Sequence, residues 1–282
     1  MIKKKIIVGT ASLGLSYGLK KKRVSYKSSI QYLKKIYDLG FKEIDTSPAY
    51  GNSNIIIKNS KKKFVIYTKL TKKILELKIS QIENFLMKSL KILKVRNFEG
   101  ILIQNESIML KEKGKKIFKL LEKFKKKNFI KQIGVSSYNF ETLRKILKIY
   151  KIDFVQVPFN IFDQRLLDPK NLNYLRKRKV DIHVRSIFLQ GLLILGNNKI
   201  PNKFKKYQKI LDYWNSWLKK NNLSSLDTCL NFVLNTKYIK KIVIGCANYN
   251  EFKNLKFNPS KRMNLSFKYK NLPEGLYNPI KW

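Results

Sequence analysis

The feature that most constrains the fold is a regular alternation of short, β-rich apolar runs with longer amphipathic segments along the 282 residues. Several of the short runs are continuously apolar, which is typical of strands buried on both faces of a parallel sheet. Eight such runs predict eight strands. The predicted strands are Lys5–Val8, Phe41–Asp45, Phe64–Lys69, Phe98–Gln104, Gln132–Val135, Asp153–Val157, Val180–Arg185 and Lys241–Ile244.

The segments between these strands carry apolar residues at the i, i+3, i+4, i+7 spacing of a helix with one buried face. Lysines occupy the opposite positions. The clearest stripes begin at Ile79, Ile117 and Phe140, and further helical patterns cover Phe204–Leu218 and Ser225–Leu234. These stripes predict core packing rather than ligand contacts.

Strands and helices alternating in this number predict a (β/α)8 TIM barrel of the α/β class. The alternative is a doubly wound open sheet, which normally has a G-x-G-x-x-G turn after its first strand. The segment Gly9–Gly14 lacks that spacing, so the barrel is favoured. No linker divides the chain, and residues 1–282 are expected to form one domain. Within it, 196–202 is expected to be a surface loop and 258–282 an irregular tail over one barrel mouth.

The charge of the chain is extreme, because 61 Lys+Arg stand against 18 Asp+Glu and give a formal net charge of +43. Surfaces that bind nucleic acid tend to favour arginine for bidentate contacts. Here 53 of the 61 basic residues are lysines scattered over nearly every segment, and alanine, with its GC-rich codons, occurs only three times. The charge therefore favours codon bias and solvated lysine faces, and we expect no nucleic-acid partner; nucleic-acid binding driven by charge is kept as a third hypothesis of function. Such a surface should still attract anionic small molecules.

The sequence predicts neither a membrane segment nor a metal site. It contains no run of about 18 apolar residues, and the apolar run near its start is too short for a signal peptide. Cys229 and Cys246 form no disulfide framework or metal-ligand spacing. His183, the single histidine, is interpreted as a satisfied core residue. We expect a cytoplasmic protein in a reducing compartment.

The carboxyl ends of the predicted strands carry the residues that could do chemistry, as in barrel enzymes generally. Asp45 ends the second strand, Lys69 the third and Gln104 the fourth. Tyr50 lies just beyond Asp45, in the loop DTSPAYGN. An ammonium ion beside a phenol makes the phenol a stronger acid, and a carboxylate can hold the ammonium in place. Together these four residues predict a general acid suited to neutral pH.

At these positions the sequence resembles the aldo-keto reductase family, over nearly its whole length. The motifs are GTASLG (9–14), GFKEIDTSPAYGNS (40–53), YTKL (67–70), ILIQN (101–105), IKQIGVSSYNF (130–140), VQVPFN (155–160), VRSIFLQGLL (184–193) and IVIGC (242–246). The resemblance implies a (β/α)8 barrel that binds NAD(P)H across its C-terminal mouth and reduces an aldehyde or ketone. A narrower similarity, in GTASLGLSYG and the closing NPIKW, is to a bacterial branch associated with surface-sugar biosynthesis and implies a sugar-derived substrate.

By this resemblance Asp45, Tyr50 and Lys69 match three members of the family's catalytic tetrad, with Tyr50 as the proton donor. Gln104 stands where the family usually has a histidine. The positions that match cofactor contacts are Gly9, Thr10 and Asp45, Ser136 and Gln156 at the nicotinamide carboxamide, Arg185 against the nicotinamide ring, Ser186 through Gly191 over the pyrophosphate, and Gly245 near the adenosine.

Two questions stay open at this stage, the cofactor and the degree of turnover. The segment 245–251 lacks the Lys or Arg that typically binds the 2′-phosphate of NADPH, yet the family preference favours NADPH, with NADH as the alternative. The expected partner is a small carbonyl substrate, which the basic surface allows to be anionic. The missing histidine supports a second hypothesis, a cofactor-binding protein with little turnover that acts as a sensor or assembly partner. The sequence carries no signal for an oligomeric state.

Overall fold

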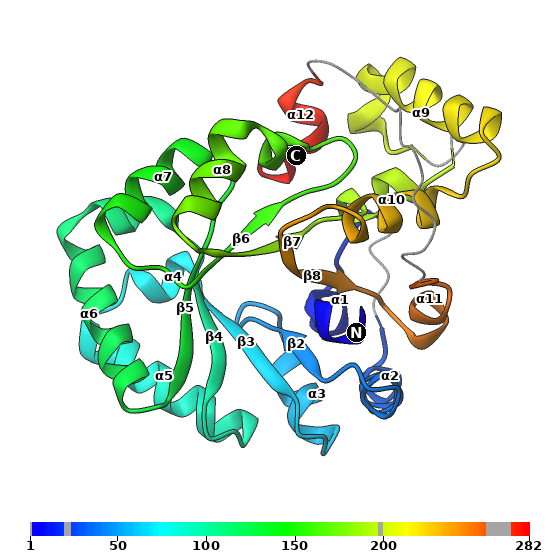
Figure 1. Cartoon of the computed structure of the whole chain (residues 1–282). Helices are drawn as coiled ribbons and strands as arrows, with labels where there is room; N and C mark the ends of the chain where they lie inside the picture. The colour runs from blue at the N-terminus through cyan, green and yellow to red at the C-terminus, as the bar shows by residue number, and fades with distance from the viewer. Residues whose placement is uncertain (1, 20–23, 197–199, 258–271) are drawn as a thin grey trace.

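The computed structural model describes residues 2–19, 24–196, 200–257 and 272–282. The eight strands pair in parallel and in chain order into a closed barrel, in which β8 pairs with β1 (Figure 1). The predicted (β/α)8 barrel is therefore confirmed. The strands are β1 Ile6–Gly9, β2 Glu43–Asp45, β3 Val65–Leu70, β4 Phe98–Ile103, β5 Ile130–Ser136, β6 Phe154–Pro158, β7 Asp181–Arg185 and β8 Ile239–Gly245.

Helices cover the outside of this barrel. They are α1 Ala11–Gly14, α2 Tyr26–Asp38, α3 Ser53–Asn59, α4 Lys72–Leu75, α5 Ile79–Leu93, α6 Glu112–Lys126, α7 Phe140–Ile149, α8 Pro169–Lys177, α9 Gln208–Lys220, α10 Ser225–Leu234, α11 Tyr249–Lys253 and α12 Glu274–Tyr277. The 3-10 helices are η1 Ile2–Lys5, η2 Glu106–Leu110, η3 Arg165–Leu167, η4 Leu189–Ile194, η6 Asn202–Tyr207 and η7 Pro279–Lys281. Helices α5 to α8 curve around one side of the strands, and α2, α10 and α11 lie on the other (Figure 1). None of the helices in the described part is long and apolar enough to cross a membrane.

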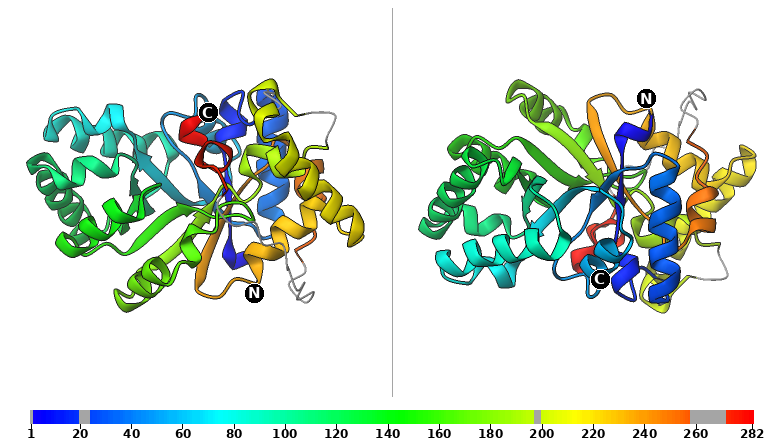
Figure 2. Two further views of the ribbon diagram at one scale, coloured as in Figure 1. Left: turned by 90° about the horizontal axis from the view of Figure 1, so that it is seen from above. Right: turned by 90° about the horizontal axis from the view of Figure 1, so that it is seen from below.

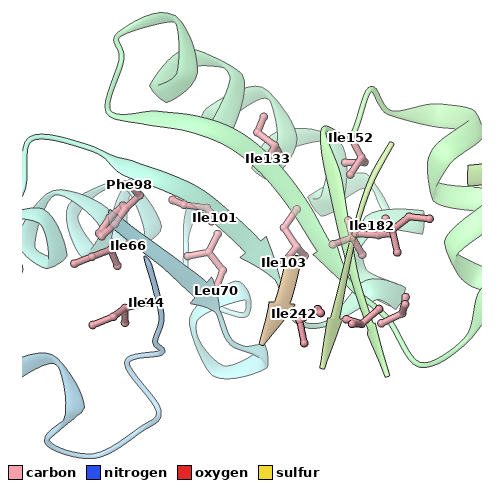
Figure 3. Close-up of a cluster of buried hydrophobic side chains, with 14 of the residues drawn as sticks. Ile44, Ile66, Leu70, Phe98, Ile101, Ile103, Ile133, Ile152, Ile182 and Ile242 are labelled. Carbon is pink, nitrogen blue, oxygen red and sulfur yellow. The ribbon is translucent and has the colours of Figure 1, made fainter. Parts of the chain in front are cut away.

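The main core lies between the barrel and its helices. Strand residues such as Ile44, Ile101 and Ile133 face outward and are almost completely buried (Figure 3). The predicted helical stripes meet them: Leu86 on α5 and Leu121 on α6 are fully buried. Burying one side chain of this size stabilises the fold by about 1.5–3 kcal/mol. This burial explains why the lysine-rich helices pack against the sheet.

Inside the barrel, alternate strand residues form three levels. The middle level is an apolar cluster of Ile7, Tyr67, Leu102 and Phe154, against which Val243 packs. Side chains at the amino-terminal ends of the strands lie on one side of this cluster, and those at the carboxyl-terminal ends lie on the other. At the chain ends, η1 and α12 likewise lie on opposite sides of the molecule (Figure 2).

Glycine makes room for the middle level at two strand positions. A Cβ atom at Gly134 would lie 2.5 Å from Cζ of Phe154, and one at Gly100 would lie 2.7 Å from Cδ1 of Tyr67. The rings of Tyr67 and Phe154 pack edge to face, with their centroids 5.6 Å apart. The absence of a side chain at Gly100 and at Gly134 is therefore what allows two aromatic rings to fill the barrel and to separate its two ends.

Two sequence expectations differ from the structure. The helix predicted over Phe204–Leu218 is split: Tyr207 has φ −107° and ψ 12°, so a 3-10 helix ends there and α9 begins at Gln208. The tail predicted to be irregular is helical in its described part, because residues 274–277 and 279–281 form α12 and η7. Packing explains this, since Leu276 is fully buried. Residues 258–271 of that tail, and part of the predicted loop 196–202, lie outside the described residues.

Candidate active site

Three of the four predicted catalytic residues form one hydrogen-bonded chain at the carboxyl ends of β2 and β3. Lys69 Nζ donates a short hydrogen bond to Asp45 Oδ1 and a second one, 3.2 Å long, to the Tyr50 hydroxyl oxygen. The Asp45 and Lys69 side chains are each only 4% exposed. Burial alone would lower the pKa of Lys69, but Asp45 and Tyr50 outweigh it, so the pKa of this ammonium is raised. Lys69 is therefore a cation beside the phenol at neutral pH.

Close backbone packing fixes the loop that carries Tyr50. A Cβ atom at Gly14 would lie 1.8 Å from the carbonyl oxygen of Tyr50, and one at Gly51 would lie 2.4 Å from the carbonyl oxygen of Gly14. Gly51 also has φ +51°, a conformation that L side chains rarely adopt. The Ser53 hydroxyl donates to the Thr10 carbonyl oxygen across the same contact. These glycines let the loops after β1 and β2 touch, and that contact places Tyr50 over Lys69.

Gln156 joins the same chain from β6, on the opposite wall of the barrel. Its Nε2 atom donates a 2.9 Å hydrogen bond to Asp45 Oδ2, so the carboxylate is held by an ammonium on one oxygen and an amide on the other. The Gln156 Oε1 atom is buried and has no hydrogen-bond partner among the described residues. An unpartnered buried carbonyl oxygen is costly, because the hydrogen bonds that it loses to water are not replaced.

Gln104 stands apart from this chain. Its backbone amide continues the pairing of β4 with β3 by donating to the Leu70 carbonyl oxygen at 3.0 Å, but its side chain is exposed. No hydrogen bond joins the Gln104 side chain to another residue in the described part. The structure therefore brings together Asp45, Lys69 and Tyr50 and leaves the fourth predicted member at the rim.

The segment after β7 has an unusual backbone. Ser186, Leu189 and Gln190 all have positive φ although none is a glycine, and Gly191 has φ +98°. Such conformations cost of order 1–3 kcal/mol each and cluster at ligand sites. Asn160 Nδ2 donates to the Ser186 carbonyl oxygen at 3.1 Å and helps to hold Ser186 in its positive-φ conformation.

The remaining predicted cofactor residues line the same mouth. Gly9 and Gly245 lie side by side at the ends of β1 and β8, and no atom comes closer than 3.7 Å to a Cβ built at Gly245. Ser136 is buried at the end of β5. Thr10 has a different environment: it is fully buried, and its backbone amide and hydroxyl both donate to the Asp45 carbonyl oxygen.

Two tyrosines at this mouth were not selected from the sequence. Desolvation, with Tyr50 as the next contribution, raises the pKa of Tyr17 to about 12, although the residue as a whole is 45% exposed. Tyr17 also lies in the electrostatic range of Arg185 and Lys69. Tyr138 carries the Arg185 guanidinium 4.0 Å from its ring centre. Both tyrosines lie in the motifs GTASLGLSYG and IKQIGVSSYNF, but spacing alone does not show that these loops converge.

Two solved structures share this architecture. The chain has a TM-score of 0.72 with the holo form of an aldo-keto reductase from Bacillus halodurans, at 16% identity over 88% of this chain and 84% of that one. With a glycerol dehydrogenase from Gluconobacter oxydans the TM-score is 0.64, at 19% identity over 86% and 83%. At such identities the likeness establishes the fold. No curated protein sequence matches the chain.

The fold is a closed (β/α)8 barrel with the hydrogen-bonded chain Asp45–Lys69–Tyr50 at its carboxyl-terminal mouth. The model of the aldo/keto reductase family matches residues 5–256. The chain belongs to the aldo/keto reductase family and is an oxidoreductase of that family. Family members typically use NAD(P)H and act on small carbonyl compounds.

The pairing of Lys69 with Asp45 predicts a large effect on stability. Lys69→Met leaves a buried carboxylate without its cation, so the free energy of unfolding should fall by about 3–5 kcal/mol in urea denaturation. The raised pKa of Lys69 means that its contribution is present below the unfolded value of about 10.4 and is lost as pH rises through the folded value. The difference between wild type and variant should therefore shrink as the pH rises above about 10.

Lys123→Met is the matched control, because Lys123 forms an exposed ion pair with Glu83. It should cost less than about 1 kcal/mol. Equal losses in the two lysine variants would show that the Asp45–Lys69 pair does not stabilise the fold.

Proposed function

We propose that this chain is an NAD(P)H-dependent reductase that converts an aldehyde or ketone into an alcohol, with Tyr50 as the proton donor. The observation that carries the proposal is the chain Asp45–Lys69–Tyr50, in which one buried ammonium bonds both a carboxylate and a phenol. A positive charge 3.2 Å from the phenol oxygen stabilises the phenolate that remains once the proton has left. This is the requirement for a general acid that works near neutral pH.

Each residue then has a separate task. The Tyr50 hydroxyl gives its proton to the carbonyl oxygen of the substrate, while a bound reduced nicotinamide supplies the hydride for the carbonyl carbon. Lys69 keeps its Nζ atom on the phenol oxygen throughout. Asp45 fixes the position of Lys69 and offsets its charge, which limits the cost of burying that charge.

The residues above Asp45 fit a nicotinamide carboxamide. Gln156 Oε1 is a buried acceptor without a partner in the described part of the chain, and the amide group of nicotinamide is a donor of matching size. Ser136 at the neighbouring strand end would hold the other side of the carboxamide, and Arg185 would lie against the ring. The backbone of 186–191 would cover the pyrophosphate. We propose NADPH as the preferred cofactor, with NADH as the alternative.

An anionic, sugar-derived carbonyl compound is the substrate class we propose. Arg185 forms no ion pair with an acidic side chain among the described residues, and its guanidinium rests on Tyr138 at the edge of the mouth. A cavity of about 520 Å³ lies beyond Tyr138 and includes Arg144, Arg165 and Lys170 in its walls. The same walls carry the carboxylates Glu106, Asp168 and Glu274, so Arg185 is the cation that favours a carboxylate or phosphate group on the part of the substrate that does not react. The narrow similarity in GTASLGLSYG and NPIKW is the basis for the sugar-derived part.

One observation favours a second candidate, a cofactor-binding protein with little turnover. The family's usual histidine is replaced by Gln104, whose side chain is exposed and makes no hydrogen bond in the described structure. A fluorescence titration with NADPH and NADH, followed by a panel of carbonyl substrates, separates the two candidates. Tight cofactor binding without turnover on any substrate would favour the sensor or assembly role.

Tyr50→Phe tests the proton donor directly. Removing a general acid typically lowers the rate by about 10²–10⁴-fold, so kcat should fall by that amount, while the dissociation constant for the cofactor stays close to wild type. The measurement is steady-state turnover together with cofactor fluorescence. The control is Tyr17→Phe, because Tyr17 is a second phenol near Tyr50 without the hydrogen bond to Lys69. A larger loss for Tyr17→Phe than for Tyr50→Phe would reassign the donor.

Gln104→Leu tests whether the amide orients the substrate. If the Gln104 amide donates to the carbonyl oxygen, losing it should cost roughly 1–3 kcal/mol in kcat/KM. Gln104→His, which keeps a donor but can also titrate, should retain activity and gain a step in its pH profile near pH 6 to 7. Wild-type kcat/KM in Gln104→Leu would confine the site to Asp45, Tyr50 and Lys69.

Gln156→Leu should separate two roles that one side chain combines. It removes both the acceptor offered to the carboxamide and the donor to Asp45, whereas Ser136→Ala removes only a carboxamide contact. Both variants should weaken cofactor binding by roughly tenfold. At saturating cofactor, only Gln156→Leu should also lose kcat, because Asp45 then holds Lys69 without its second partner. If the two variants have the same kcat, the Gln156–Asp45 bond has no part in turnover.

A further inference from the structure

A second polar cavity lies at the amino-terminal end of the barrel, and we name it the floor cavity. It has a volume of about 380 Å³ and is lined by Glu43, Val65, Tyr67, Glu99, Gln132, Asp181, His183, Lys240 and Lys241. These residues come from six strands, so the cavity is part of the barrel itself and not a surface loop. The space can hold several water molecules or one small organic molecule.

Three buried atoms on residues that line this cavity have no hydrogen-bond partner among the described residues. They are Glu43 Oε2, Gln132 Oε1 and His183 Nδ1. His183 is only 1% exposed, and its ring lies 4.5 Å from that of Phe154. The histidine is therefore a core residue as predicted, but it is not a satisfied one. Buried polar atoms nearly always have a hydrogen-bond partner. Three unpaired atoms on the residues of one cavity therefore indicate a ligand or ordered water.

The chemistry of these atoms selects the kind of ligand. Burial, followed by the nearby Lys241 and Lys240, lowers the pKa of His183 to about 3, so the ring is neutral and its free nitrogen can accept a hydrogen bond. Burial also raises the pKa of Glu43, and its bond to Lys241 offsets this only in part. Glu43 Oε2 and Gln132 Oε1 are thus acceptors, and His183 Nδ1 is a third in the tautomer that carries its proton on Nε2. They require a partner with several N–H or O–H donors, and positive charge on it would relieve the Glu43 carboxylate.

We propose that the floor cavity binds a small primary ammonium compound. Its three N–H donors match the three acceptors, and its short carbon chain would lie against Val65 and Tyr67. Of the three lining carboxylates, Glu43 is paired with Lys241 and Glu99 with Lys131, whereas Asp181 forms no ion pair in the described part of the chain. A directly coordinated metal ion is a poorer match, because the described residues contain no group of three His, Cys, Asp or Glu placed to hold one.

The floor cavity is independent of the proposed active site. The apolar level of Ile7, Tyr67, Leu102 and Phe154 lies between them. Binding at the floor can therefore be measured without cofactor or turnover, and its result does not depend on the reductase proposal.

The test is calorimetric titration of the unliganded protein near neutral pH with propylammonium chloride at constant ionic strength. Saturable binding is expected, with a dissociation constant in the millimolar range. Tetramethylammonium chloride, which has the charge but no N–H donor, and potassium chloride should not bind. Equal affinity for tetramethylammonium would reduce the effect to charge attraction and overturn the proposal. No binding of any of the three ions would show that the cavity holds only water, and would also overturn it.

Variants then locate the site. His183→Phe and Gln132→Leu each remove one acceptor with little change in size, and each should weaken propylammonium binding severalfold. Glu43→Gln removes the charge and should weaken it roughly tenfold or more; Lys241 keeps its bond to the Lys4 carbonyl oxygen. Glu83→Gln, on the outer face of α5, makes the same charge change away from the cavity and should have no effect. Circular dichroism checks folding. Unchanged affinity in the folded acceptor variants would place binding elsewhere and refute the proposal.

Discussion

The arrangement of side chains at the carboxyl-terminal end of the barrel depends on one buried carboxylate, that of Asp45. A charge with so little solvent exposure must be balanced by partners inside the protein. Lys69 balances it from β3 and Gln156 from β6, so strands on opposite walls are tied at one point. The backbone carbonyl of Asp45 is bound as well, by Thr10. The placement of Tyr50 follows from this arrangement, since its hydroxyl is bonded to the lysine that Asp45 holds.

The barrel interior separates two polar ends by an apolar level. Gly100 and Gly134 allow the rings of Tyr67 and Phe154 to fill the barrel at that height. Charged groups above and below are then kept from one another and from a continuous column of water. This separation explains how a barrel can carry an ion pair at each end, Asp45–Lys69 above and Glu43–Lys241 below, with each set by its own surroundings.

The sequence predicts the scaffold well because the scaffold depends on local patterns. Apolar runs and helical stripes report burial, and the period of two along a strand places Lys69, Gln156 and Arg185 on the inner face. What joins these side chains is not local. The bond from Gln156 to Asp45 spans 111 positions, and the exposure of Gln104 depends on side-chain direction at a strand end. The contact of Tyr17 with the mouth depends on how two loops fold over it, which no spacing reveals.

Carboxylates are scarce in this chain, and those inside the barrel neutralise the lysines that are buried there. A chain with a net charge of +43 surrounds every internal site with lysines, and a buried lysine without a partner would be strongly disfavoured. Asp45 and Glu43 each bind a lysine within the barrel, so the interior stays close to neutral. Surface charges beyond about 8–10 Å are largely screened at physiological salt. The electrostatic environment of Tyr50 is therefore set by Lys69 and Asp45, a few ångströms away, and not by the basic surface that dominates the composition.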